Sequence, residues 1–131
     1  MKSVYDNIKF LASLVPATRT ASANGNAVDT TGFGSAALTI SAGDIDTTSG
    51  DETYAFKVQE SADGSTGWAD ISGATATITA DNTVALIRLE GLNTGDRQRY
   101  VRAVLTAAGT TPSIPCSAVF ALGRAYKEPV N

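Results

Sequence analysis

The sequence predicts an all-β protein: a single β-sandwich or squashed barrel of about eight mostly antiparallel strands with extended terminal arms. Three observations support this fold class. Apolar residues recur with a period of two far more often than with the 3.6-residue period of a helix. Turn residues separate these short runs at intervals typical of sandwiches and barrels. Ala, Thr, Gly, Ser and β-branched residues dominate, with only one Met among 131 residues.

The clearest strand covers residues 54–60, where aromatic and aliphatic side chains alternate with polar ones. Such alternation gives a strand one buried face and one exposed face. Asp63 and Gly64 follow, and this pair favours the positive-φ positions of a turn. Residues 68–71 can then return as the paired strand. We therefore expect a β-hairpin here.

The remaining strands are shorter runs between turn signals. They are expected at residues 11–20 around a break at Pro16, 36–41, 75–79, 84–89, 100–106 and 117–122. The side chains expected to share one core are Tyr54, Phe56, Val58, Leu86, Val101, Val119 and Phe120. A single helical turn near residues 5–11 is the only helix that the pattern allows.

The chain is expected to form one domain with a segment at each end. The expected boundaries are an N-terminal arm at residues 1–11, a β-sandwich domain at 12–123 and a C-terminal tail at 124–131. Val4, Tyr5, Ile8 and Phe10 are too apolar for a solvated tail. Either they order on a neighbouring subunit as an attachment arm, or they form the domain's own first strand and cover its sheet edge.

Charge and cysteine content exclude several classes of partner and compartment. The formal net charge is −3 with 18% charged residues, so no basic excess draws the chain to nucleic acid or to anionic lipid. The apolar stretch at residues 8–15 is too short to span a bilayer and lacks the form of a signal peptide. Cys116 is the only cysteine, so the fold must be stable in a reducing cytoplasm without an intrachain disulfide.

The residue types needed for catalysis are scarce, so we expect no enzyme activity, no catalytic residue and no cofactor. Histidine is absent, which removes the commonest general base and the commonest neutral metal ligand. Cys116 is expected to be a buried, inert thiol. The acidic loop at residues 43–52 could offer oxygen ligands to Ca²⁺, but it does not match an EF-hand loop. A solvated loop is the preferred interpretation, and no metal site is expected.

Arg97, Arg99 and Trp68 are the candidate binding residues outside the N-terminal segment. The two arginines can pair with acidic groups on a partner or with acidic groups of the chain itself. The intrachain candidates are Asp96, Glu90 and Glu60. Trp68 follows the expected turn and is either an exposed platform for a sugar ring or a partner, or a core residue. Both pairs of alternatives remain open at the level of sequence.

Several segments, in this order, resemble a family of small virion proteins. They are Gly25–Asp29, Phe56–Gly64, Trp68–Ile71, Arg99–Ala103 and Ala118–Gly123. Together they resemble the capsid decoration, or cement, proteins that accompany the major capsid protein in tailed bacteriophages. The resemblance covers the chain from about Ala12 to Gly123.

The resemblance implies a structural virion protein that is made in the host cytoplasm and binds the outer surface of the capsid. The implied partner is the major capsid protein, and the implied assembly is a homo-oligomer, with a trimer as one option. The strand-turn-Trp and Arg-Tyr-Val-Arg elements also resemble discoidin-type, galactose-binding-like sandwiches. The alternative function is therefore a carbohydrate-binding or host-surface adhesion module.

Overall fold

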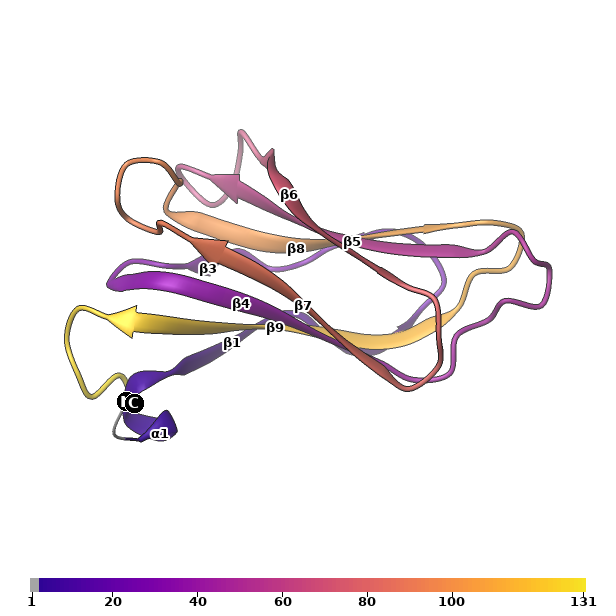
Figure 1. The fold of residues 1–131 in the computed structure, drawn as a ribbon. Coiled ribbons are helices and arrows are strands. Elements are labelled where there is room, and N and C mark those ends of the chain that lie inside the picture. Colours follow the sequence, from indigo (N-terminus) through magenta and orange to yellow (C-terminus); the bar gives the residue numbers. More distant parts are fainter. Residues whose placement is uncertain (1–2) are drawn as a thin grey trace.

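The computed structural model describes residues 3–131, which fold into two antiparallel sheets stacked face to face (Figure 1). The elements are α1 (Val4–Asn7), β1 (Lys9–Arg19), β2 (Ala23–Asn24), β3 (Val28–Asp29), β4 (Phe33–Ala42), β5 (Thr53–Ser61), β6 (Ala69–Ile78), β7 (Thr83–Glu90), β8 (Tyr100–Ala108) and β9 (Ile114–Ala125). The first sheet has the order β1-β9-β4-β7, and the second has the order β2-β8-β5-β6, with β3 also paired to β8. The expected all-β sandwich is confirmed.

The core lies between the two sheets and is built from alternate residues of the long strands. Leu38 and Ile40 of β4 and Phe120 of β9 are completely buried from one side, while Phe56 and Val58 of β5 close it from the other. This alternation is the period-two pattern of the sequence. Within the described residues 3–131, no helix is long and apolar enough to cross a membrane.

The hairpin expected around Asp63 and Gly64 is present as β5 and β6. The Asp63 carboxylate accepts hydrogen bonds from the backbone N–H groups of Ser65 and Thr66, at 2.9 and 2.8 Å. Gly64 has φ +77°, and a Cβ atom there would lie 3.0 Å from the Tyr100 ring. A left-handed backbone and a close aromatic neighbour together require glycine at this position.

Several expected boundaries differ from the observed ones. The runs at residues 68–71 and 75–79 belong to one strand, β6, and the two-residue strands β2 and β3 were not expected. β1 begins at Lys9, inside the range expected as an N-terminal arm, because residues 9–12 pair with β9. Met1 and Lys2 of that arm lie outside the described residues. β9 continues to Ala125, inside the expected C-terminal tail.

Two residues expected in the core lie on the outer side of the first sheet. Leu86 is 67% exposed, and Val119 is only half-buried. β7 carries apolar side chains on both faces, so its alternation does not reveal which face is inward. Ile87 and Leu89 are the buried ones, at 3% exposure each.

β1 is an irregular edge strand of the first sheet. Its pairing with β9 shifts register between Ala12 and Leu14 and again between Leu14 and Ala17. Pro16 stands within the second shift and has no N–H group to donate. β1 therefore bends along the sandwich instead of presenting a regular edge.

The buried hydroxyl group of Ser13 joins this edge to the second sheet. Its Oγ donates to the Asn26 carbonyl oxygen at 2.7 Å and accepts from the Ala103 N–H at 2.9 Å. Ala103 lies in the gap where β2 has ended and β3 has not begun. A Cβ on Gly25 would press against Ser13 Oγ and lie 2.9 Å from the Ala103 carbonyl oxygen. The contact therefore requires the hydroxyl group of Ser13 on β1 and the absence of a side chain at Gly25, which lies opposite it.

Replacing Ser13 with alanine should lower the free energy of unfolding by about 1–3 kcal/mol, because it leaves the Ala103 N–H buried without a partner. Ser22 supplies a matched control: its Oγ contacts both backbone groups of Ala107, but at an exposed position. Ser22→Ala should cost less than about 0.5 kcal/mol, since water replaces the hydroxyl. Urea unfolding of both variants measures the difference, and equal losses would contradict this role of Ser13.

Candidate partner-binding surface

The outer face of the second sheet is polar and its charges are paired within the chain. Asp70 of β6 accepts from Gln59 Nε2 at 2.8 Å and from Lys57 Nζ at 3.1 Å. Arg102 of β8 donates to Gln59 Oε1 at 2.7 Å. The threonines Thr75, Thr77 and Thr106 stand on the same face. The outer face of the second sheet is therefore a polar surface that is stable in contact with water.

The outer face of the first sheet exposes large apolar side chains beside small and hydroxyl-bearing ones, and three rows of paired residues cross it. They are Phe10, Ala121, Ala37 and Arg88; then Ala12, Val119, Thr39 and Leu86; then Ser117, Ser41 and Val84. We name these rows, without Arg88, the apolar face. Phe10, Val84 and Leu86 are 57, 63 and 67% exposed. Exposed large apolar side chains gathered on one face make it the candidate interaction surface of the described residues.

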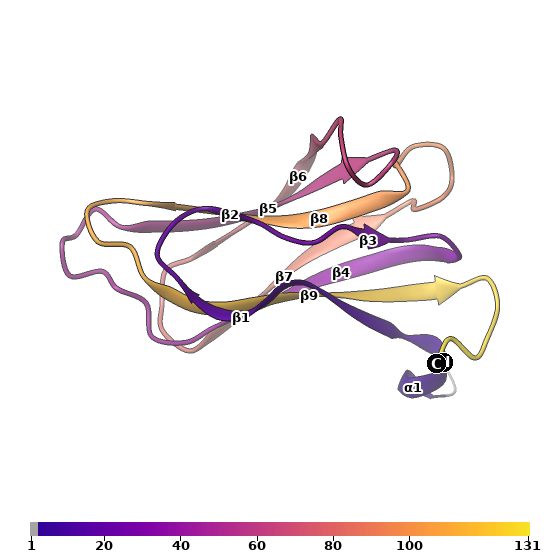
Figure 2. The ribbon, with the colours of Figure 1, turned by 180° about the vertical axis from the view of Figure 1, so that it is seen from behind.

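The two chain ends meet at one end of the apolar face. We name α1 together with residues 126–131 the terminal cluster, which lies below β1 and β9 in Figures 1 and 2. The Val130 N–H donates to the Asp6 carbonyl oxygen at 3.0 Å, and Asn131 Nδ2 donates to the carbonyl oxygens of Tyr5 and Ile8 at 2.6 and 2.9 Å. Residues 5–8 are therefore held by the C-terminal end of their own chain.

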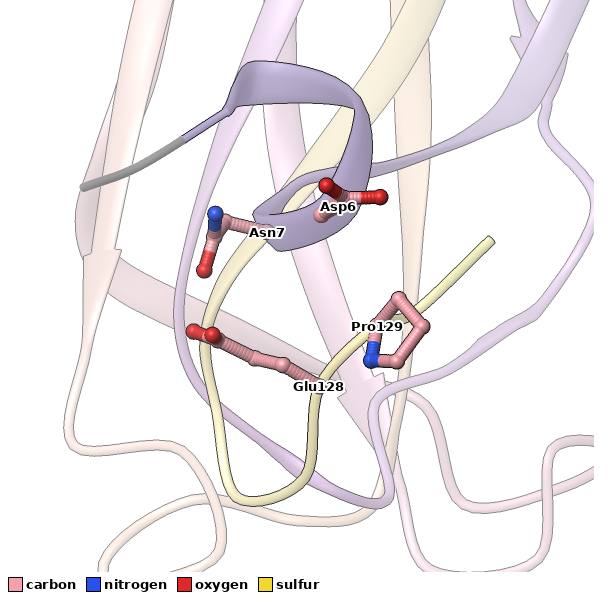
Figure 3. Close-up of a pocket in the computed structure, with 4 residues that line it drawn as sticks. All are labelled: Asp6, Asn7, Glu128 and Pro129. Atoms are coloured by element: carbon pink, nitrogen blue, oxygen red, sulfur yellow. The ribbon is translucent and has the colours of Figure 1, made fainter.

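A pocket of about 300 Å³ lies within the terminal cluster (Figure 3). Asp6 and Asn7 of α1 line one side, and Glu128 and Pro129 of the tail line the other. Around it, Val4 and Tyr5 remain 57 and 69% exposed. The cluster thus adds exposed apolar side chains next to the apolar face.

The two candidate arginines are paired within the chain. Arg97 Nε lies 3.7 Å from Glu60 Oε1, which was one of the intrachain candidates. Arg99 makes a bidentate pair with Asp29, at 2.9 and 2.7 Å, that the sequence did not indicate. Hydrogen bonds from Arg99 hold the pKa of the Asp29 carboxyl well below its usual range, and the same pairing raises the pKa of Arg99.

Trp68 stands just before β6 and stacks on Arg102. The Arg102 guanidinium carbon lies 4.4 Å from the ring centroid, which is a close cation–π contact. The Trp68 side chain is half-buried, and burial lowers the pKa of Arg102. Trp68 is neither a core residue nor a platform with both ring faces open.

The acidic loop between β4 and β5 uses its carboxylates to hold its own backbone and the loop before β9. Asp46 accepts from the Thr48 N–H and hydroxyl, at 2.9 and 2.7 Å. Asp51 does the same for Thr110, at 3.0 and 2.7 Å, and these hydrogen bonds lower the pKa of both carboxyls. In residues 3–131, no three His, Cys, Asp or Glu side chains are grouped to hold a metal ion.

Cys116 lies on the inward side of β9. The residue is 6% exposed, and desolvation raises the pKa of its thiol. A thiol held in the protonated form is a poor nucleophile. The expectation of a buried cysteine is confirmed.

The structure divides the sequence-derived candidates into two groups on different sheets. Ile8 and Phe10, with Val4 and Tyr5, lie at the first sheet, whereas Arg97, Arg99 and Trp68 lie at the second. Sequence reasoning missed the other members of the apolar face, above all Val84 and Leu86. The available signal was the run of apolar residues at 84–87, which gives β7 two apolar faces.

Comparisons with known proteins add no family assignment. No protein-family model matches the chain, and no curated protein matches it with statistical significance.

Replacing Asp29 with asparagine should destabilise the protein near neutral pH but have less effect in acid. The Asp29 pKa is lowered by folding from an ordinary value of 3.8, so its contribution is complete above that value and is lost as the pH falls below about 4. The difference in melting temperature between wild type and Asp29→Asn should therefore be constant from about pH 5 to 8 and shrink below about pH 4.

The control for this prediction is the same substitution in an Arg99→Gln background. The difference at neutral pH should be smaller there, because the bidentate partner is gone while the hydrogen bonds from Thr31 to Asp29 remain. A difference that stays constant down to about pH 2 would contradict the assignment of the pH dependence to this pair.

Proposed function

We propose that this chain is a non-enzymatic structural protein of a phage virion that binds the outer surface of the capsid through its apolar face and stabilises it. The observation that carries the proposal is the contrast between the two outer faces. One is a network of paired charges, amides and hydroxyls, whereas the other exposes Phe10, Val84 and Leu86 beside small side chains. A protein that uses only one of its outer faces for contact has this asymmetry.

Burial of the apolar face supplies the binding energy. Fully burying an exposed Val, Leu or Phe side chain contributes about 1.5–3 kcal/mol, and Phe10, Val84 and Leu86 stand at the edges of the face. Arg88 is the only charged side chain in its three rows, so little desolvation of charge opposes binding. The complementary surface on the major capsid protein is accordingly apolar and largely uncharged.

Many weak contacts suffice on a capsid, because its sites repeat. A homo-oligomer, such as a trimer at a three-fold position, links several copies of the face and raises the avidity without new contacts. Stabilisation follows because each bound copy adds buried interface that must be broken before neighbouring capsid subunits separate. The capsid as partner rests on the resemblance of the sequence, while the binding face rests on the structure.

Replacing Leu86 with aspartate should weaken cosedimentation with expanded empty capsids by at least about tenfold, because it puts a charge in place of an exposed apolar side chain that binding would bury. The substitution should leave the melting temperature almost unchanged, since the Leu86 side chain is already exposed. The matched control is Thr77→Asp, which is also an exposed strand position but lies on the polar face.

The control variant should bind capsids like the wild type. If Thr77→Asp abolished binding while Leu86→Asp did not, the polar face would be the contact surface. A glycan array distinguishes the carbohydrate-binding alternative. Glycan binding that is lost in Trp68→Ala and kept in Leu86→Asp, without any capsid binding, would overturn the proposal.

A further inference from the structure

Each sheet of the sandwich has two edges, and three of these edges are interrupted. The pairing of β1 shifts register twice, and the edge of the second sheet beside β8 breaks between β2 and β3. Along β6, residues 71–74 stand opposite the single residue Val58 of β5, and Gly73 has φ +79°. Such irregularities make an edge a poor template for another strand.

β7 is the regular edge. It pairs residue by residue with β4 from Thr83 to Glu90, without a register shift. In the described residues 3–131, no strand pairs with its other side, which faces the viewer in Figure 1. Residues 83–87 carry no charge, and alternate residues of an antiparallel edge strand turn their N–H and C=O groups to the open side. A long, regular and apolar edge of this kind favours pairing with another strand.

We propose that β7 pairs antiparallel with β7 of a second copy of this chain, with Leu86 opposite Leu86 of the second copy. The two-fold axis of this dimer is perpendicular to the first sheet, so two four-stranded sheets join into one continuous sheet. The axis keeps the outer sides of both sheets on the same side, and the two apolar faces become continuous. This inference goes beyond the proposed function and does not depend on it.

The charges of β7 favour this register. With Leu86 on the axis, residues 83–89 pair, and Arg88 lies opposite Val84 of the second copy. The two Arg88 side chains are then four residues apart along the strands, or about 13 Å. With Ile87 on the axis they would be diagonal neighbours, about 7–8 Å apart, and with Arg88 on the axis they would be directly opposite. Like charges in such positions are destabilising.

The same register covers the large apolar side chains that β7 exposes. Leu86 is 67% exposed and Val84 is 63% exposed. The Cβ atoms of two Leu86 residues that lie opposite each other are about 4.5–5.5 Å apart. Val84 packs on the aliphatic part of Arg88 of the second copy. Moving the axis to Ala85 would pair only residues 83–87, so fewer backbone hydrogen bonds would form.

A second copy fits this edge better than an extended peptide of another protein. β7 is already a strand, held by its ladder to β4 and by the buried side chains of Ile87 and Leu89. An unstructured peptide would lose conformational entropy at every residue that it adds to the sheet. Two β7 strands lose little on pairing, and each provides partners for the open backbone groups of the other.

Cysteine crosslinking tests the pairing and its register, in a Cys116→Ala background. Leu86→Cys should form a disulfide-linked dimer on mild oxidation, because directly opposite residues come within reach of a disulfide. Val84→Cys and Arg88→Cys should each stay uncrosslinked alone, because each position is about 13 Å from its counterpart. A mixture of these two variants should give the mixed dimer. The control is Thr106→Cys, an exposed position on the polar face.

Charge at position 84 tests the same contact without a crosslink. Val84→Glu places a carboxylate opposite Arg88 of the second copy and should tighten dimerisation by about threefold or more, whereas Val84→Lys should weaken it by a similar factor. Within one copy Val84 pairs with the uncharged Ser41, so neither change should alter the melting temperature of the monomer. Sedimentation equilibrium over a series of concentrations measures the dissociation constant, with Thr106→Glu and Thr106→Lys as controls.

The chain overturns the proposal if it remains monomeric at about 1 mM and Leu86→Cys gives no crosslink. Self-crosslinking of Val84→Cys as fast as that of Leu86→Cys would overturn the register and with it this dimer. Because Leu86 belongs to both surfaces, Phe10→Asp separates the dimer from the proposed function: Phe10 lies on β1, at the other edge of the sheet.

Phe10→Asp should weaken capsid binding and leave dimerisation unchanged. Dimerisation that Phe10→Asp abolishes would mean that two apolar faces stack, and it would overturn the pairing through β7. Dimerisation that follows the charge at position 84, in a protein that does not bind capsids, would support this inference while the proposed function fails.

Discussion

The hydroxyl group of Ser13 holds the two sheets together where the second sheet has no edge strand. Between β2 and β3 the N–H group of Ala103 would be buried without a partner, and a side chain from the other sheet supplies one. Because this bond is buried, water cannot replace it. It also fixes β1, and β1 carries Phe10 at one edge of the apolar face. The shape of the apolar face thus depends on a hydrogen bond made on the other side of the same strand.

The two outer faces differ in the free energy of removing them from water. On the second sheet, Lys57, Gln59, Asp70 and Arg102 satisfy one another, so that face gains nothing from leaving water. On the first sheet, Thr39 and Val119 lie among apolar neighbours and lose little solvation when covered. Specificity on such a face comes from shape and from the few charges at its end, while affinity comes from area and copy number.

Short-range sequence patterns predicted the strands and one turn. The contacts between residues far apart in the sequence could not be predicted in this way. The alternation around Phe56 and the turn at Asp63 and Gly64 are local signals, and both were interpreted correctly. The pair of Asp29 with Arg99 spans 70 residues, and that of Ser13 with Ala103 spans 90, so no short motif reveals them. The apolar face could not be predicted for another reason. β7 carries apolar side chains on both sides, and periodicity alone does not show which side is buried.

The irregular course of β1 limits how many molecules of this protein can join by pairing their edge strands. Endless edge-to-edge growth requires the edge of one molecule to pair with the opposite edge of the next. The register shifts and Pro16 make the β1 edge a poor template, and the second sheet is likewise interrupted between β2 and β3. Pairing through β7 alone would stop at two molecules. These interrupted edges protect the protein from growing into fibres, even though one of its outer faces exposes apolar side chains.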